Sequence, residues 1–356
     1  MTASGLPTLQ LNWHYRSQHE SLIAFSNWNY YGNKLVTFPA ADVADRGVQF
    51  RYVPDAIYDR GKSKTNQTEA EAIVADAVKR MKQNLELSAE DRSTFGVITF
   101  NSQQQSLIQD LFDQAQRDNP ELDWYFSDDR VEPTVVKNLE NVQGDERGVM
   151  YFSITFGKDI SGKAIPLTFG ALNRDGGERR LNVAITRARE QLLVFCSFRA
   201  DELKLSKKRG VADLKAFLEY AEKGPVAIAA RTEGSVGGYD SPFEEAVADA
   251  LTDRSWQLVP QVGVSGFRVD LGVQHPDKPG AFLAGVECDG ATYHRSAIAR
   301  DRDKTRQQVL ESLGWNILRV WSPDWWYDSA SAIEIIDSEL KRLLEEERNP
   351  PAEDAS

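Results

Sequence analysis

The sequence predicts a two-domain α/β protein in which a parallel-sheet domain precedes a smaller α/β domain. Continuous apolar runs, such as FGVITF at 95–100 and QLLVFCSF at 191–198, alternate with amphipathic helical segments. This alternation is typical of a parallel sheet covered by helices on both faces. A polar stretch rich in Gly and Ser at 231–242 separates this region from the next. With 356 residues, the chain is also longer than a single core usually spans.

The expected elements follow the chain in a regular order. In the first domain we expect a helix at 17–30, a strand at 48–54, a helix at 68–85, a strand at 95–100 with a helix directly after it, strands at 147–157 and 191–198, and a helix at 210–224. In the second domain we expect a helix that Ser241 caps and Pro242 begins, strands at 256–262, 267–274 and 282–289, a helix at 296–313, a strand in NILRVWS and a helix at 329–347. The predicted boundaries are 1–200 for the first domain, 201–240 for a helix and linker, 241–348 for the second domain and 349–356 for a disordered tail.

Composition limits the class of protein. Hydrophobic residues make up 41% of the chain, which is ordinary for a globular protein, and no apolar run approaches membrane-spanning length. The net charge of −12 counts against a purely electrostatic nucleic-acid binder, but it allows an enzyme with an acidic metal site. Cys196 and Cys288 lie far apart in apolar, strand-like segments. They are expected to be buried thiols, which indicates a reducing, cytoplasmic setting.

Three carboxylates fall on two of the expected strands of the second domain. Asp270 lies in FRVDLGV at 267–273, and Glu287 and Asp289 share one side of GVECDG. If the two strands pair as a hairpin, the three acids can converge on one face. Like charges at close range repel one another, and a hard divalent cation such as Mg²⁺ or Mn²⁺ relieves that conflict. The sequence therefore predicts a metal site at this end of the hairpin.

The order of these residues resembles the PD-(D/E)XK nuclease superfamily, and within it the branch related to very-short-patch repair endonucleases. The resemblance covers about residues 241–328, through FRVDLGV, GVECDGATYH and RDRDKTRQQVLESLGWNILRVWS. It implies Glu244 as the helix acid, Asp270 and Glu287 as metal ligands, and the main-chain carbonyl of Cys288 as a third contact. Asp289 stands where the general pattern has lysine, so Lys304 is the candidate to replace it. The resemblance also suggests His294 for a phosphate or water contact; Arg300 shares the basic helix face of Lys304 and is a candidate nucleic-acid contact.

Each of these residues also has a structural explanation. Asp289-Gly290 is a common turn sequence, and a glutamate near a helix start is usually an exposed charge. An inert nuclease-fold module that only binds DNA therefore stays open as an alternative.

The first domain resembles the second RecA-like domain of superfamily 1 helicases. LNWHYRS at 11–17 resembles motif IV, VQGDERGV at 142–149 resembles motif V, and LNVAITRARE at 181–190 resembles motif VI. The match covers about residues 9–199. It implies an ATP site that includes Tyr15, Arg16, Gln143, Gly144, Glu146 and Arg187. An arginine at such a site stabilises charge during phosphoryl transfer.

A second set of residues in this domain is expected to contact nucleic acid. Thr99, Asn101 and Gln104 lie where a strand runs into a helix, and exposed N–H groups at a helix start suit a phosphate. Motifs IV to VI do not distinguish DNA from RNA, so an RNA-directed motor also stays open; with the nuclease resemblance, DNA is the favoured partner.

The chain contains no convincing phosphate-binding loop. GKS at 61–63 lacks the preceding glycine of a Walker A motif, because Ala56 stands at that position. We therefore expect a piece of a larger helicase–nuclease whose first RecA-like domain lies outside this chain. ATP would be a cofactor only of the full-length protein, and the chain alone should show no appreciable ATP hydrolysis.

Overall fold

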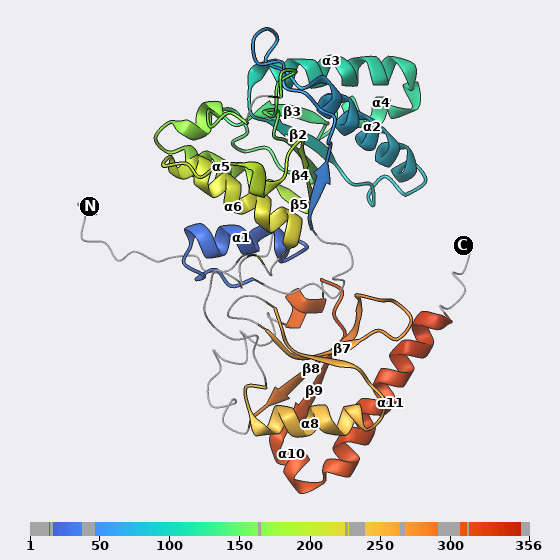
Figure 1. Cartoon of the computed structure of the whole chain (residues 1–356). Helices are drawn as coiled ribbons and strands as arrows, with labels where there is room; N and C mark the ends of the chain where they lie inside the picture. Colours follow the sequence, from blue (N-terminus) through green and yellow to red (C-terminus); the bar gives the residue numbers. More distant parts are fainter. Residues whose placement is uncertain are drawn as a thin grey trace, which may run out of the picture. The chain divides into compact units, whose positions relative to one another are not determined.

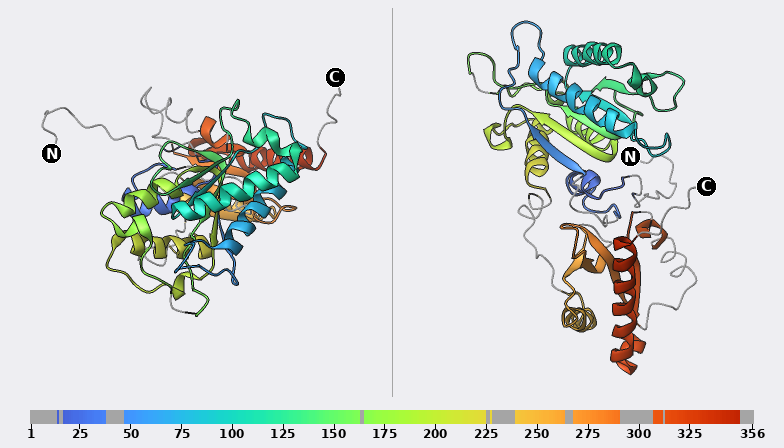
Figure 2. Two further views of the ribbon diagram at one scale, coloured as in Figure 1. Left: turned by 90° about the horizontal axis from the view of Figure 1, so that it is seen from above. Right: turned by 90° about the vertical axis from the view of Figure 1, so that its right-hand side faces the viewer.

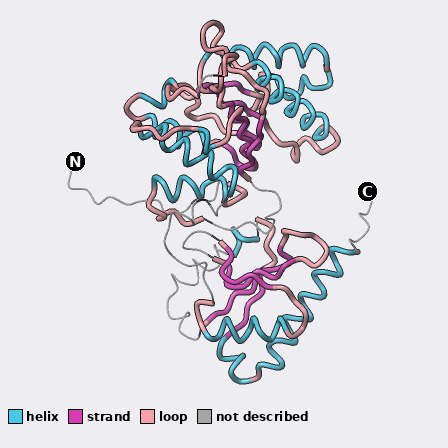
Figure 3. The backbone as a smooth tube through the Cα atoms, viewed as in Figure 1, coloured by secondary structure: helices cyan, strands magenta, loops and turns pink. Residues whose placement is uncertain are grey.

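The structure is a computed structural model. It describes residues 14, 17–37, 47–162, 165–224, 227, 239–263, 268–290, 307–311 and 313–349. Contacts divide the chain into two compact units. We call the described residues of 21–32 and 46–232 the parallel-sheet unit, and those of 1–20, 33–45 and 233–356 the mixed-sheet unit. The two sheets are separate in the tube drawing (Figure 3).

The parallel-sheet unit contains five strands, all parallel to their neighbours, in the order β1-β5-β4-β2-β3. The strands are β1 (Val48–Tyr52), β2 (Phe95–Thr99), β3 (Val135–Asn138), β4 (Arg147–Ser153) and β5 (Ala188–Cys196). Every residue of β2 and β4 is buried. Parallel strands of this kind are apolar throughout because helices cover both faces of the sheet.

Helices form a layer on each face of this sheet (Figure 1). They are α1 (Ser21–Tyr30), α2 (Gln67–Asn84), α3 (Ser102–Asp118), α4 (Asp123–Phe126), α5 (Gly177–Ile185) and α6 (Arg209–Lys223), with short 3-10 turns at Pro120–Leu122, Gly170–Asn173 and Ala200–Glu202. Alternate residues of the strands separate into two cores. On β4, Met150 and Phe152 pack in the same core as α1, α5 and α6, whereas Val149 and Tyr151 pack in the core of α2 and α3.

The mixed-sheet unit contains four strands in the order β6-β7-β8-β9. They are β6 (Leu258–Val262), β7 (Val269–Gln274), β8 (Phe282–Asp289) and β9 (Ile317–Trp321). β7 runs antiparallel to both β6 and β8, and β9 runs parallel to β8. The start of β7 therefore lies at the same end of the sheet as the ends of β6 and β8.

The helices of this unit include α8 (Pro242–Thr252), α10 (Ser322–Tyr327) and α11 (Ser329–Arg348), and the described residues 307–311 are also helical. α8 and α11 contribute to one apolar core with the sheet, and α11 extends beside the strands in a second view (Figure 2). Ser241 begins α8 as its cap, since its hydroxyl accepts the N–H of Glu244 at 3.2 Å.

The predicted fold class is confirmed: a parallel α/β sheet is followed by a smaller α/β unit with a mixed sheet. Some residues group differently from the predicted boundaries. Residues 33–37 group with the mixed-sheet unit, where Val36 packs beside Val269 and Trp315. Among the residues described, no helix is both long and apolar enough to cross a membrane.

Candidate functional site

The β7–β8 hairpin brings Asp270 to the end of β8. Leu271 pairs with Val286 in the register, and the Asp270 carboxylate extends across to accept the N–H of Cys288 at 2.8 Å. This bond places the carboxylate of Asp270 at the main chain between Glu287 and Asp289. Glu287 itself is buried, with 5% of its surface exposed. The hairpin that the sequence predicted is therefore present, with the acids at one end of it.

Four carboxylates lie near Cys288, whose own side chain packs against the apolar core. Burial raises the pKa of this thiol well above its usual range, and the negative charges of Asp270, Glu244, Glu287 and Asp289 raise it further. The carboxylates near Cys288 offer oxygen donors, which suit a hard divalent cation.

Glu244 is held by the start of its own helix and by β6. Its carboxylate accepts hydrogen bonds from the Ser241 hydroxyl at 3.1 Å, from the Asp240 N–H at 2.9 Å and from the Gln261 amide at 2.9 Å. The first two contacts form a capping arrangement that fixes the first turn of α8. Gln261 has a positive φ of 52°, a conformation that L-residues rarely adopt. This backbone distortion at the end of β6 accompanies the contact between Gln261 and the acid.

Asp289 has a cation beside it. Arg319 on β9 lies 3.3 Å from the Asp289 carboxylate, and both side chains are largely shielded from solvent. Within the described ranges, no group of three or more His, Cys, Asp or Glu side chains is arranged to hold a metal ion. The acids are thus gathered, but their side chains do not form a closed ligand set.

Several predicted residues lie outside the part of the chain that the structure describes. They are His294, Arg300 and Lys304 of the second domain, and Tyr15 and Arg16 of motif IV. Their predicted roles stay predictions.

The residues of motifs V and VI meet at the amino-terminal edge of the parallel sheet. Arg187 directly precedes β5, and its guanidinium donates to the Glu146 carboxylate at 3.0 Å and to the Val183 carbonyl at 2.9 Å. Gln143 and Gly144 lie on an exposed loop directly before β4, and Gly144 has a φ of +97° that favours glycine. Of the six residues predicted for ATP, the four that the structure describes are therefore close in the chain or in space, with Arg187 and Glu146 paired to each other.

The residues predicted for nucleic acid lie at the opposite, carboxyl-terminal edge. Asn101 caps α3 by accepting the N–H of Gln104 at 2.7 Å, and its amide donates to the Lys64 carbonyl at 3.0 Å. Thr99 and Gln104 are fully buried, and the Thr99 hydroxyl donates to the Asn101 carbonyl at 2.8 Å. These side chains support the local structure, so a direct contact with a nucleic-acid strand would require their exposed neighbours.

A buried carboxylate lies beside this edge. Glu69 on α2 accepts the Ser153 hydroxyl at 2.6 Å and the Thr155 N–H at 2.8 Å. Burial raises its pKa to about 8, against the opposing effect of these two hydrogen bonds. Gln104 joins the same network through Ser153 at 3.3 Å and through the main chain of Asn66. The network connects α2, α3 and β4.

Two polar residues of the mixed-sheet unit were missed at the sequence level. Gln261 contacts Glu244, and Arg319 contacts Asp289. Each is a polar residue within an otherwise apolar strand, LVPQV and ILRVW. That contrast is the signal that could have indicated both, because a polar side chain in a covered strand requires a partner.

The fold and the site together define a class: a helicase-type domain with a parallel sheet, followed by a restriction-endonuclease-like domain with acids at one end of a mixed sheet. The chain belongs to the family described as "AAA domain", whose model matches residues 1–199. Residues 243–340 match the family model REase_MTES_1575.

Two curated relatives from bacteria are similar to the chain. "Uncharacterized ATP-dependent helicase MG140 homolog" of Mycoplasma pneumoniae is 30% identical over 333 residues, which is 88% of this chain and 28% of that protein. "Uncharacterized ATP-dependent helicase MG140" of Mycoplasma genitalium is 35% identical over 218 residues, 60% of this chain and 18% of that protein. The chain thus spans less than a third of the length of these relatives.

A solved structure titled as the C-terminal domain of a possible DNA helicase from Lactobacillus plantarum WCFS1 also aligns, at 13% identity over 51% of this chain and 86% of that chain. Its TM-score is 0.29, a level of likeness from which nothing further follows.

Proposed function

We propose that the mixed-sheet unit hydrolyses DNA phosphodiesters with Mg²⁺ or Mn²⁺, and that the parallel-sheet unit is the second half of an ATP-driven nucleic-acid translocase. The observation that carries the first part is the bond from the Cys288 N–H to Asp270, which places this carboxylate at the main chain between Glu287 and Asp289. The family match to an AAA domain and the helicase names of the two relatives support the second part.

The donor set fits a hard divalent cation. Asp270 and Glu287 are the ligands we propose, with the Cys288 carbonyl as a third oxygen. Magnesium sites commonly use one or two protein carboxylates and complete the shell with substrate phosphates and water, so an incomplete protein set is consistent with such an ion. When bound, the ion would polarise the phosphate and lower the pKa of a coordinated water molecule.

The remaining residues act by positioning. Gln261 donates to Glu244 and holds that carboxylate at the end of the sheet, and the Cys288 N–H orients Asp270. Arg319 neutralises part of the charge of Asp289, which leaves Asp270 and Glu287 as the better candidates for a cation. Lys304 would offset charge that develops on the phosphate in the transition state.

An inert DNA-binding module is the second candidate. It is favoured by the pairing of Asp289 with Arg319 and by the lack of a three-ligand group within the described residues. Cleavage assays with divalent ions, run beside binding assays in a chelator, distinguish the two functions.

The test uses the whole chain and labelled single-stranded and duplex DNA. We expect metal-dependent cutting that Asp270→Asn and Glu287→Gln each reduce about 100-fold or more, because each removes charge that acts in the transition state. Glu245→Gln is the matched control: Glu245 follows Glu244 on α8 but is exposed, so this variant should cut like the parent. A parent that binds DNA but cuts with neither ion would instead support the inert module.

The translocase half has its own test. The chain alone should show no appreciable ATP hydrolysis, since the proposed ATP site requires a further RecA-like domain. Strong turnover that Arg187→Ala abolishes would contradict this. Competition binding between DNA and RNA at a stated salt concentration tests the choice of nucleic acid.

A further inference from the structure

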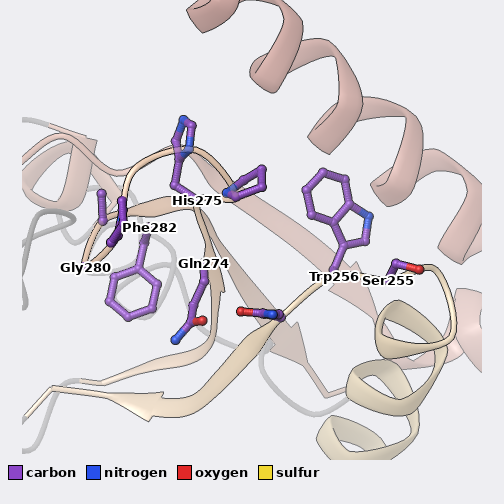
Figure 4. Close-up of a pocket in the computed structure, with 10 residues that line it drawn as sticks. Ser255, Trp256, Gln274, His275, Gly280 and Phe282 are labelled. Atoms are coloured by element: carbon purple, nitrogen blue, oxygen red, sulfur yellow. The ribbon is translucent and has the colours of Figure 1, made fainter.

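The mixed-sheet unit has a pocket at the end of the sheet opposite the carboxylates. It has a volume of about 500 Å³, and its ten lining residues come from the segment before β6, the end of β7 and the turn into β8 (Figure 4). Trp256, Gln257, Gln274, His275 and Phe282 are among them. The volume lies within the range of small-ligand sites.

Two glutamine amides line this pocket side by side. The Gln274 N–H donates to the Gln257 carbonyl at 2.8 Å, which sets the two residues opposite each other on neighbouring segments. Within the described part of the chain, neither side-chain amide forms a hydrogen bond with the protein. An amide offers one acceptor and two donors, and together these can bind the edge of a nucleobase bidentately.

One aromatic ring, that of Phe282, lies on the same face of the sheet as the two amides. Trp256 extends to the opposite face, where its indole N–H donates to the buried carboxylate of Asp337 at 2.8 Å. Phe282, which pairs with Gln274 in the strand register, stacks on Trp315 with ring centroids 5.2 Å apart. In the close-up, the side chains of Gln274 and Trp256 extend to opposite sides of the strands (Figure 4). A wall fixed like the Phe282 ring loses little conformational freedom when a ligand binds.

The charges near the pocket are already compensated. Of its ten described lining residues, His275 alone can titrate, and its Nε2 lies 3.0 Å from the Glu347 carboxylate. Lys278 also pairs with Glu347. A free phosphate would therefore find no cation available in the lining. A neutral, planar group with hydrogen-bonding edges matches the combination of amides and rings.

We propose that this pocket binds one unpaired nucleobase of the nucleic acid on which the chain acts. The proposal rests on the proposed function for its substrate class. Asp270 and Gln274 are separated by four residues along β7, or roughly 13 Å at the usual rise of a strand. The pocket would hold a base a few nucleotides from the carboxylates and so select substrates with an unpaired segment.

The experiment uses a series of fluorescent single-stranded oligonucleotides, each with a single abasic site at a different position. Binding is measured by anisotropy in a chelator, where metal-dependent cleavage cannot occur. We expect loss of the base to weaken binding about tenfold at one position and little elsewhere, the size typical of one stacked or bidentately bound base. In Gln257→Ala/Gln274→Ala that position should become indistinguishable from its neighbours. Gln83→Ala, which changes an exposed glutamine on α2, should keep the positional effect.

The outcomes separate this proposal from the proposed function. The base pocket would be overturned if the abasic site weakened binding equally at every position. It would also be overturned if the positional effect persisted in the double variant. If the parent binds no oligonucleotide, the proposed function fails instead, and titration with free nucleosides then decides on the pocket. A shift of the Trp256 indole resonance in the parent but not in the double variant would support it, and no shift in the parent would overturn it. An unchanged thermal midpoint shows that the variant is folded.

Discussion

The two units treat their carboxylates in different ways. In the parallel-sheet unit each acid near a predicted site has its own local partner: Glu146 contacts Arg187 at 3.0 Å, and Glu132 contacts Arg189 at 2.6 Å. Glu69, which lies deepest, accepts two hydrogen bonds from neutral donors through one carboxylate oxygen, while the other oxygen is buried without a partner among the described residues, and its pKa is raised. In the mixed-sheet unit, four carboxylates lie near one residue, Cys288, and one of them, Asp289, has a cationic partner in Arg319.

This difference shows which acids are costly to the fold. In a pair such as Glu146–Arg187, the attraction between the charges offsets the free-energy cost of removing them from water. A cluster of carboxylates has no such compensation, because its charges repel one another unless a cation binds. Repulsion of that kind is common at functional sites, because activity and stability make opposite demands on the same residues. The comparison therefore favours the mixed-sheet unit as the place for an ion.

The largest effect is expected for Glu69, which is the isolated buried acid of the comparison. Its pKa is about 8 in the fold, against about 4.5 in the unfolded chain. The folded state therefore holds a proton that the unfolded state releases, so this group makes the unit less stable as pH rises from 4.5 towards 8. Since one pKa unit corresponds to about 1.4 kcal/mol, the change should amount to a few kcal/mol.

Urea unfolding at several pH values measures this effect. Glu69→Gln should remove most of the decline and be more stable than the parent at the alkaline end. Glu71→Gln, an exposed position two residues away on α2, should follow the parent at every pH. Parallel curves for Glu69→Gln and the parent would mean that Glu69 is ionised in the fold, and the contrast between the units would weaken.

Asp270→Asn has an intermediate expected effect on the mixed-sheet unit. Asparagine keeps an oxygen that can accept the Cys288 N–H but removes one of the four negative charges. In a chelator we expect the variant to be more stable than the parent by about 1 kcal/mol, measured by thermal unfolding. Added Mn²⁺ should then stabilise the parent more than the variant, because binding to the native state alone raises its stability.

The matched control is Asp249→Asn, which removes an exposed carboxylate of α8 that lies outside the cluster. It should change neither the stability in chelator nor the response to Mn²⁺. If Asp270→Asn is less stable than the parent without metal, then the acids do not repel one another appreciably, and the reasoning that links the cluster to an ion loses its basis.

The fold could be predicted from the sequence because its signals are local and repeated. The continuous apolar runs that form most of β2, β4 and β5 are buried on both faces of the sheet. The prediction therefore did not have to decide which face of each strand is buried. The hairpin of β7 and β8 was also predictable, since it follows from two adjacent strands. In contrast, Val36 packs against the mixed-sheet unit through a contact between residues more than 200 positions apart, and no local pattern indicates such a contact.

The candidate sites were less predictable, because a motif gives residue types but not their partners. Asn101 and Gln104 have the composition of a phosphate contact, yet in the structure one caps α3 and the other is fully buried. Gln261 illustrates the reverse case: its contact with Glu244 depends on a left-handed backbone at one residue of β6, which alternation along a strand does not indicate.

The smallest effect is expected for the pair of Arg187 and Glu146, and a double-mutant cycle measures it. Both side chains are largely shielded, with 15% and 21% of their surface exposed, and Arg187 also bonds to the Val183 carbonyl. Arg187→Ala and Glu146→Ala should each destabilise the parallel-sheet unit by about 1 kcal/mol, with a coupling between them below that value. Metal-dependent cleavage, if the chain cuts DNA, should be unchanged in both variants. A coupling near zero would mean that the two residues do not depend on each other in the absence of nucleotide, so that their pairing would no longer distinguish this unit from the mixed-sheet unit.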